Sequence, residues 1–399
     1  MSAPKKSEEL FSNTAFNFPA PLKDSTNFTI TLKNIPAGKT ANLYAGGAGT
    51  MPQNANATRI GCDFTYDLIT RSSNDAGFST FYESGDADIS GAAGEEGRYV
   101  VFISSSAGFA GSPGKHRQLF FRDRNVGTTK LISAAPNGEE GNGDSFAPVI
   151  SADGTAVAFE SYSSNLVEQD KNGVRDIFIW HAATNKIETV SIGEGGKDAN
   201  AESYEPSISG DGNMVAFTST ASNISLTEKG ISNNNVFLRD LQKGTTSMIS
   251  IDPLAHKGGG GSKPSISQNG NRIAFYSHTS TLVPNDKNGI WDIFLWEKNK
   301  AFLKRVSLTA DGKEREQGNE SANRVVSPAI SGNGRYITFA TTATNMVPGD
   351  ANNYQDIFVY DITTNTTIMV SNTNDGKQGN GDSQLGRVKK LPFHLMDVG

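Results

Sequence analysis

The stretch PVISADGTAVAF at residues 148–159 recurs three more times, as PSISGDGNMVAF at 206–217, PSISQNGNRIAF at 264–275 and PAISGNGRYITF at 328–339. A more divergent fifth copy begins near Ile89. The copies end in phenylalanines that lie 57, 58, 58 and 64 residues apart, namely Phe102, Phe159, Phe217, Phe275 and Phe339. Self-similarity at a fixed period is typical of propellers and solenoids. The repeat therefore predicts an array of equivalent units that share one continuous core.

The second copy reads as four short strands. Residues 148–151 form a short innermost strand, and Asp153-Gly154 suits a two-residue turn with positive φ at both positions. Residues 155–161 alternate as a strand packed on both faces does. The third strand is DIFIW at 176–180, and KIETVS at 186–191 forms the outer strand.

The other copies keep the same order of elements. A phenylalanine recurs in each third strand and is expected in the core, where its burial contributes roughly 1.5 to 3 kcal/mol; these residues are Phe120, Phe178, Phe237, Phe294 and Phe358. Four strands in about 60 residues predict the blades of an all-β propeller, a fold that leaves only short, protected sheet edges.

Five full copies occupy residues 87–371, and a sixth is split between the two ends of the chain. Residues 1–86 contain strand-like segments at 27–33, 41–45 and 63–71. Residues 372–399 include GNGDS at 379–383, which matches GNGDS at 141–145, and a degenerate innermost strand at 392–395. The sequence predicts a single six-bladed β-propeller over residues 1–399, closed by N- and C-terminal strands that share one blade.

The composition limits the partners and the location of the chain. A net charge of -6 argues against nucleic acid as the main partner, because phosphate binding needs a positive field. No run of about 18 apolar residues is present to span a membrane, and the opening residues contain no apolar segment of a signal peptide. Cys62 is the single cysteine, so an intrachain disulfide cannot form.

An acidic pattern, D-x-N-G-x-x-D, recurs in the loop before the third strand. Oxygen ligands at alternate loop positions, followed by an acid, suit Ca²⁺, which accepts six to eight oxygens in flexible geometry. The candidate ligands in the three copies, of which the last has Asn353 in place of the glycine, are Asp170, Asn172, Asp176, Asp286, Asn288, Asp292, Asp350, Asn352 and Asp356.

A structural role explains the same residues. The last aspartate of each copy can accept backbone N–H groups from the preceding loop while Asn-Gly makes the turn. In the two remaining copies Gln118 and Asn235 take its place, which keeps the hydrogen bonding and removes the charge. If a metal is bound, those two blades are expected to lack it.

The segment PGDANNYQDIFVYDITTNTTIMVS at 348–371, with PAISGNGRYITF before it, resembles the WD-like propeller repeats of the bacterial TolB-like family. The resemblance covers about residues 87–371. It implies a propeller that binds other proteins and an extracellular or periplasmic location. The residues before the first full copy do not read as the separate α/β domain that TolB carries.

Catalytic patterns are absent from the sequence. It contains no G-x-S-x-G nucleophile elbow, and its five histidines show no H-E-x-x-H spacing. The expected function is a non-catalytic binding or structural module that presents loops to a protein or glycan partner, alone or within a larger assembly. The alternative is a hydrolase or lyase that uses the central funnel of the propeller.

Overall fold

The computed structural model describes residues 84–92, 97–105, 112, 114–225, 234–300, 302–316, 326–373 and 376–383, together with four short N-terminal strands. The chain divides into two compact units, Met1–Ile69 and Thr70–Gly399. In the first unit, β1 (Asn27–Thr29) pairs with β3 (Ala48–Thr50), and β2 (Asn42–Leu43) pairs with β4 (Ile60–Gly61).

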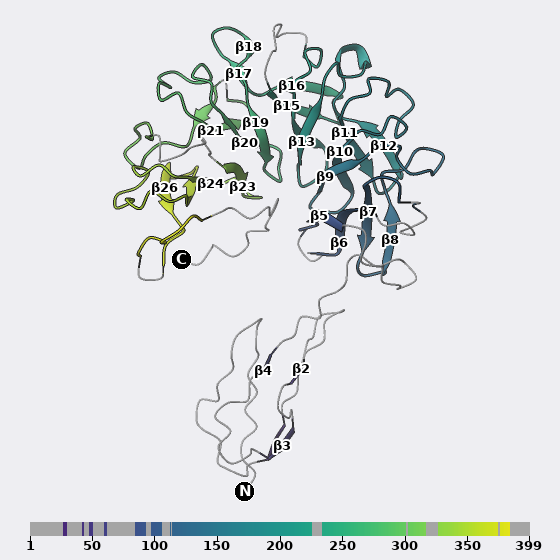
Figure 1. The fold of residues 1–399 in the computed structure, drawn as a ribbon, viewed down its shortest axis with the longest axis horizontal. Helices are drawn as coiled ribbons and strands as arrows, with labels where there is room; N and C mark the ends of the chain where they lie inside the picture. Colours follow the sequence, from purple (N-terminus) through teal and green to yellow (C-terminus); the bar gives the residue numbers. More distant parts are fainter. Residues whose placement is uncertain are drawn as a thin grey trace. The chain divides into compact units, whose positions relative to one another are not determined.

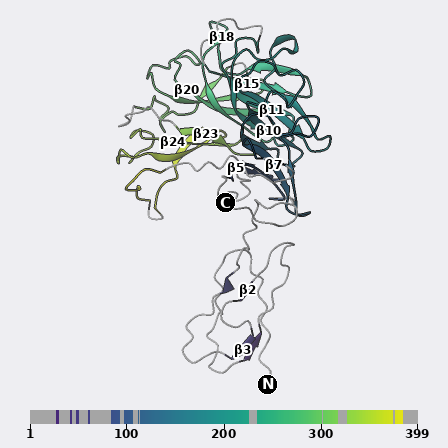
Figure 2. The same ribbon diagram turned by 45° about the vertical axis from the view of Figure 1, so that its right-hand side comes forward.

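The described residues of the second unit form five antiparallel sheets of four strands, here named blades I to V in chain order (Figures 1 and 2). Blade I consists of β5 (Ser84–Ile89), β6 (Tyr99–Ser104), β7 (Gln118–Asp123) and β8 (Thr128–Leu131). Blade II consists of β9 (Ser145–Ile150), β10 (Ala156–Ser161), β11 (Asp176–His181) and β12 (Lys186–Thr189). Blade III consists of β13 (Ser203–Ile208), β14 (Met214–Ser219), β15 (Asn235–Asp240) and β16 (Thr245–Met248).

Blade IV consists of β19 (Ser262–Ile266), β20 (Arg272–Ser277), β21 (Asp292–Glu297) and β22 (Lys304–Arg305). Blade V consists of β23 (Val326–Ile330), β24 (Tyr336–Thr341), β25 (Asp356–Asp361) and β26 (Thr366–Met369). A small hairpin of β17 (Ile251–Asp252) and β18 (Lys257–Gly258) links blades III and IV, and a short 3₁₀ turn, η2 (Glu194–Gly196), lies between blades II and III. The predicted all-β blades of four strands are confirmed.

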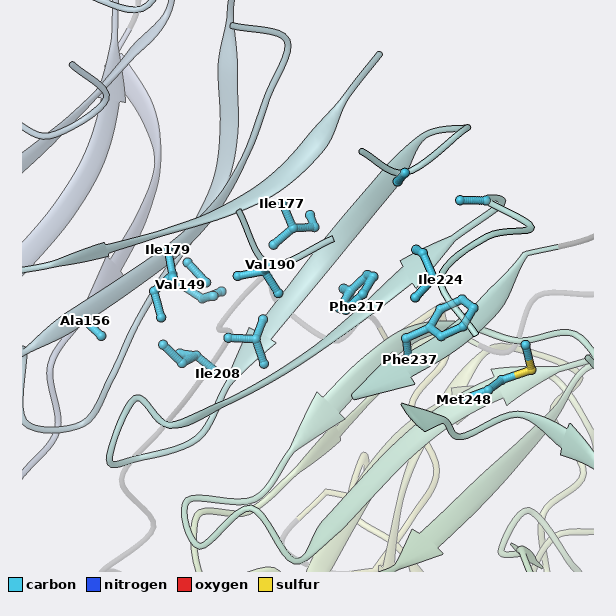
Figure 3. Packing of buried hydrophobic residues seen from close by; sticks show 14 residues of the cluster. Val149, Ala156, Ile177, Ile179, Val190, Ile208, Phe217, Ile224, Phe237 and Met248 are labelled. Carbon is cyan, nitrogen blue, oxygen red and sulfur yellow. The ribbon is translucent and has the colours of Figure 1, made fainter. Parts of the chain in front are cut away.

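The repeated phenylalanines form the centre of each blade. Phe217 of β14 lies opposite Phe237 of β15, with their ring centroids 5.7 Å apart, and the other four blades repeat this pair. The second strands of blades II to IV are buried on both faces, so one face packs against the preceding blade and the other against the next. Figure 3 shows the cluster in which Ile177 and Ile179 of blade II meet Ile208 and Phe217 of blade III.

Backbone hydrogen bonds join the hairpin turns of consecutive blades. The N–H of Ala152 donates to the carbonyl of Gly210 (2.9 Å), and the N–H of Gly210 donates to that of Gln268 (2.7 Å). Gln268 continues the series to Gly332 (3.0 Å). Each bonded residue lies in the turn between the first and second strands of its own blade. The first strands of neighbouring blades also contact each other. The inner edges of the blades are therefore held at a constant spacing.

The turn itself differs from the predicted two-residue turn. Ser151 and Ala156 close the hairpin, so the connection has four residues, and within it only Gly154 has a positive φ (+73°). Asp153 instead accepts hydrogen bonds from the Ser151 hydroxyl (2.6 Å) and the Thr155 N–H (3.0 Å). The Ile-Ser-x-Asp/Asn-Gly pattern thus encodes a side-chain-capped turn with one left-handed glycine.

The closing blade stays a prediction, because residues 63–71 and 392–395 lie outside the described part of the chain. The start of a sixth repeat is present at Ser383. Its N–H donates to the carbonyl of Gln355 (2.7 Å), as the N–H of Ser145 donates to that of Arg117 (2.8 Å) at the start of blade II. The serines of the two GNGDS segments therefore make equivalent backbone hydrogen bonds in their own parts of the chain.

Replacing Phe217 by alanine is expected to lower the free energy of unfolding by roughly 3 to 5 kcal/mol, because it empties a fully buried aromatic site between blades II and III. Urea unfolding measures the loss. Phe302→Ala serves as the control, since that side chain is 71% exposed and its removal leaves no cavity. A loss below about 1 kcal/mol for Phe217→Ala would contradict the packing described here.

Gly154→Ala is expected to cost about 2 kcal/mol or more, because alanine is strained at φ +73° and its Cβ would lie 2.1 Å from Cδ2 of Tyr99 in the preceding blade. Gly173→Ala is the matched control. It has a similar φ (+69°) and no atom within 4 Å of a new Cβ, so only the backbone strain applies. Equal losses in thermal or urea unfolding would show that the contact between the blades contributes nothing.

Candidate functional site

All nine predicted calcium ligands lie at one end of their blades. In blade II, Ser145, Ser161 and Asp176 stand side by side where the first strand begins, the second ends and the third begins. We call this the loop end, and the end that carries the hairpin turns the turn end. The predicted ligands occupy the loop from the second to the third strand, or the first residue of the third strand.

The first residue of each third strand accepts a hydrogen bond from a serine that follows the fourth strand. Ser191 Oγ donates to Asp176 Oδ1 (2.6 Å) and accepts from the N–H of Ile177 (3.0 Å). Asp292 and Asp356 repeat this arrangement with Ser307 and Ser371. Gln118 and Asn235 repeat it without a charge, with Ser133 and Ser250. A serine hydroxyl, rather than a loop N–H as predicted, is the donor common to all five positions.

The loop asparagines use their side-chain oxygens to form turns. Asn172 Oδ1 accepts the N–H of Val174 (3.0 Å), while its Nδ2 donates to Asp176 Oδ2 (2.6 Å). Asn288 forms the same bonds in blade IV, and Asn352 forms the turn in blade V but donates to the carbonyl of Gly379. The predicted turn role of these residues is therefore present in the structure.

The first acids of the three loops differ in their partners, although each is only 8% exposed. Asp286 Oδ1 in blade IV accepts from Arg305 Nη1 at 2.7 Å. Asp350 Oδ1 in blade V accepts from Gln378 Nε2 at 2.9 Å. In blade II the corresponding oxygen, Asp170 Oδ1, is buried and has no hydrogen-bond partner.

A further residue belongs to this arrangement and was missed in the sequence. In blade II, Asp198 Oδ2 accepts the N–H of Lys171, which follows Asp170 (2.9 Å). Glu314 and Gln378 accept the equivalent N–H groups in blades IV and V. The signal that could have revealed it is a Gly-Lys pair before an acid or its amide, which recurs at residues 196–198, 312–314 and 376–378.

The electrostatics of the three loops follow these contacts. Burial, with the nearby charges of Asp176 and Asp198, raises the pKa of Asp170 to about 6. Burial also raises the pKa of Asp176 to about 6, against the hydrogen bonds from Ser191 and Asn172. In blade IV burial raises the pKa of Asp286, but the Arg305 guanidinium opposes the shift.

The carboxylates do not by themselves complete a metal site. Within the described ranges, no three His, Cys, Asp or Glu side chains converge closely enough to hold a metal ion. Asp350 Oδ2 and Asp356 Oδ2 in blade V are buried without a hydrogen-bond partner, as Asp170 Oδ1 is in blade II. Any bound Ca²⁺ would need carbonyl or water oxygens to complete its shell.

The same end of blades II to IV carries a cluster of aromatic and charged side chains. Arg175 lies over the rings of Tyr162 (5.7 Å) and Tyr204 (4.8 Å) and forms ion pairs with Glu160 and Glu202. In blade IV, the ring of Trp291 lies 4.7 Å from that of Tyr276 and 4.6 Å from that of His278. We call the residues of this cluster the aromatic face; its rings are Tyr162, Tyr204, Tyr276, His278 and Trp291. Tyr162 is 44% exposed, so part of the face is open to a partner.

Five consecutive four-stranded sheets that share one strand order and the same serine contact at the loop end define the chain as a β-propeller protein. The propeller blades that the resemblance of the repeats implied are present in the structure. No family model and no curated protein matches the sequence.

The solved structures that are similar to this chain include two TolB structures and one propeller domain. TolB from Acinetobacter baumannii has 16% identity and a TM-score of 0.40, over 75% of this chain and 57% of that chain. A putative TolB from Agrobacterium tumefaciens has 13% identity and a TM-score of 0.43, over 73% and 82% of the two chains. The propeller domain of the Trilobed protease from Pyrococcus furiosus has 11% identity and a TM-score of 0.44, over 73% and 72%. The chain thus spans little more than half of the Acinetobacter protein.

The raised pKa of Asp170 predicts a pH-dependent effect of Asp170→Asn. The unfolded chain loses this proton near pH 4 and the folded chain near pH 6, so folded wild type loses stability as the pH rises between these values. The stability of Asp170→Asn relative to wild type is expected to rise by roughly 1 to 3 kcal/mol from pH 4 to 6 and then to level off. Urea unfolding in a chelator at each pH measures the difference. A stability difference between variant and wild type that does not change with pH would contradict the raised pKa of Asp170.

Proposed function

We propose that this protein is a non-catalytic β-propeller module that binds a protein or glycan partner through the loop end of blades II to IV. The observation that carries the proposal is the aromatic face. Tyr, Trp and Arg are enriched at the centres of protein interfaces, where they combine apolar area with hydrogen-bonding groups. Rings with neighbouring carboxylates also suit a glycan, whose hydroxyl groups need acceptors.

The charged members of the aromatic face are held in place before any partner binds. Glu160 Oε1 accepts the N–H of Glu205 in the next blade (2.7 Å), and its other oxygen pairs with Arg175 at 3.0 Å. Glu205 Oε2 in turn accepts from Thr218 and from the N–H of Lys263 in blade IV. The contacts of Glu160 hold the arginine that lies over the two tyrosine rings, which lowers the entropy lost on binding.

Calcium is proposed as a stabilising ion at the acid-bearing loops of blades II and V, whose buried carboxylates have no arginine partner in the described part of the chain and which lie at the same end of the blades. An ion that binds only the folded chain stabilises it, by about 2.7 kcal/mol at a concentration one hundred times the Kd. Among the described residues, no helix is long and apolar enough to cross a membrane. An extracellular or periplasmic location, where millimolar calcium would load such loops, and a place in a larger assembly remain part of this proposal.

A double variant, Tyr204→Ala with Trp291→Ala, tests the proposed face. It is expected to weaken partner capture at least tenfold, because it removes two half-buried rings while leaving the second and third strands paired. Phe302→Ala is the matched control, an exposed ring between β21 and β22 at the turn end. Binding is measured by affinity capture with mass spectrometry and on a glycan array.

The outcomes separate the classes of function. Loss of a captured protein in the double variant supports a protein partner, and loss of an array signal supports a glycan. Capture that is unchanged in the double variant but lost in Phe302→Ala would place the interface at the turn end and refute the proposal. Turnover of a captured glycan or peptide would favour the hydrolase or lyase alternative.

A further inference from the structure

The three acid-bearing loops form a matched set in which one blade already contains its cation. In blade IV, Arg305 Nη1 lies 2.7 Å from Asp286 and 3.3 Å from Asp292, and its Nη2 lies 3.0 Å from Glu314. A second buried guanidinium, that of Arg315, lies 3.5 Å from Asp292. The guanidinium of Arg305 therefore stands among three carboxylates in the described structure.

Blade II presents the equivalent three carboxylates without the cation. Thr189 lies opposite Phe178 as Arg305 lies opposite Phe294, so a neutral side chain takes the place of the arginine. Among the residues that the structure describes, no lysine or arginine forms an ion pair with Asp170, Asp176 or Asp198.

The second observation is a buried carboxylate oxygen in blade II, Asp170 Oδ1, that has no hydrogen-bond donor. Asp170 is 8% exposed, and its Oδ1 has no donor, whereas the same atom of Asp286 receives the guanidinium and that of Asp350 receives the amide of Gln378. A carboxylate oxygen buried without a donor or a cation is strongly unfavourable, because it has lost its water and gained no partner. Blade V also has two buried oxygens without donors, but it holds two carboxylates rather than three and a neutral amide in the third position.

We propose that the loop end of blade II binds one divalent cation, with Asp170 and Asp176 as direct ligands and Asp198 as the third charge, where blade IV uses Arg305. This inference rests on the calcium part of the proposed function and narrows it to one loop. Ca²⁺ is the ion that the chemistry favours, because every candidate ligand is oxygen and the shell must be completed by carbonyls and water in an irregular loop. Asp198 is only partly buried, which leaves an approach for the ion from solvent.

The test is calorimetric titration of Ca²⁺ into the chelated full chain and into three variants. Asp170→Asn removes one charge and keeps a hydrogen-bond acceptor. Thr189→Arg introduces the guanidinium of blade IV at the equivalent position of blade II. Asp286→Asn makes the same change as the first variant in the loop that Arg305 already neutralises.

Wild type is expected to bind Ca²⁺ with a rise in melting temperature. Asp170→Asn and Thr189→Arg are expected to weaken this binding at least tenfold, and Asp286→Asn is expected to leave it unchanged. In chelator, Asp170→Asn is expected to melt at or above the wild-type temperature, because it removes repulsion between buried carboxylates. That last result confirms that the variant folds and shows that its lost binding is local.

Three results would overturn the proposal. Binding that persists unchanged in both blade II variants would place the ion elsewhere in the chain, which would refute this inference and leave the calcium part of the proposed function intact. Equal loss in Asp286→Asn would show that the effect is not specific to blade II. Absence of any heat and any thermal shift in wild type would refute the calcium proposal as a whole, while partner capture through the aromatic face would remain a separate result.

Discussion

The backbone hydrogen bonds between successive hairpin turns are the constraint on which the rest of this structure depends. Each turn offers its N–H to the carbonyl of the equivalent residue in the next blade, from Ala152 to Gly210 and on to Gln268 and Gly332. Both partners are main-chain groups, so a change of side chain cannot adjust the geometry of this hydrogen bond. The capped serine turn and its left-handed glycine recur in blades II to V, and with them recurs the relative placement of the four strands.

Because the backbone repeats so regularly, a difference in sequence between two blades changes the chemistry at one equivalent position. The serine that follows the fourth strand bonds to an aspartate in blades II, IV and V and to an amide in blades I and III, with nearly the same geometry. The charge at this position is therefore not needed to hold the strands together. Where the charge is kept, the structure either neutralises it with arginine, as in blade IV, or leaves it without a cation, as in blade II. A buried carboxylate without a cation is unfavourable unless a ligand binds to it.

The features proposed here to bind a partner and a cation are those that break the repeat. The aromatic face occupies blades II to IV, and Arg305 and Arg315 occur in blade IV, while the same capped turn recurs in blades II to V. A β-propeller supports many unrelated activities, so the shared fold does not select among them. The argument for partner binding and for a cation comes instead from the particular side chains that neighbouring loops bring together.

The sequence by itself determined the strand order, the phenylalanine core and the position of the turns, because alternation of side chains and left-handed glycines are local properties that a repeat displays several times over. It also placed Asp170 and Asn172 in one loop and Asp176 at the start of the strand that follows it. Only the tertiary structure decided which charges meet. Asp198 reaches the backbone beside Asp170 across 27 residues, and Arg305 reaches Asp286 across 19, because antiparallel strands return the chain to the same end of the blade. No local pattern encodes that distance, so the difference between a neutralised and an open acidic loop could be read only from the fold.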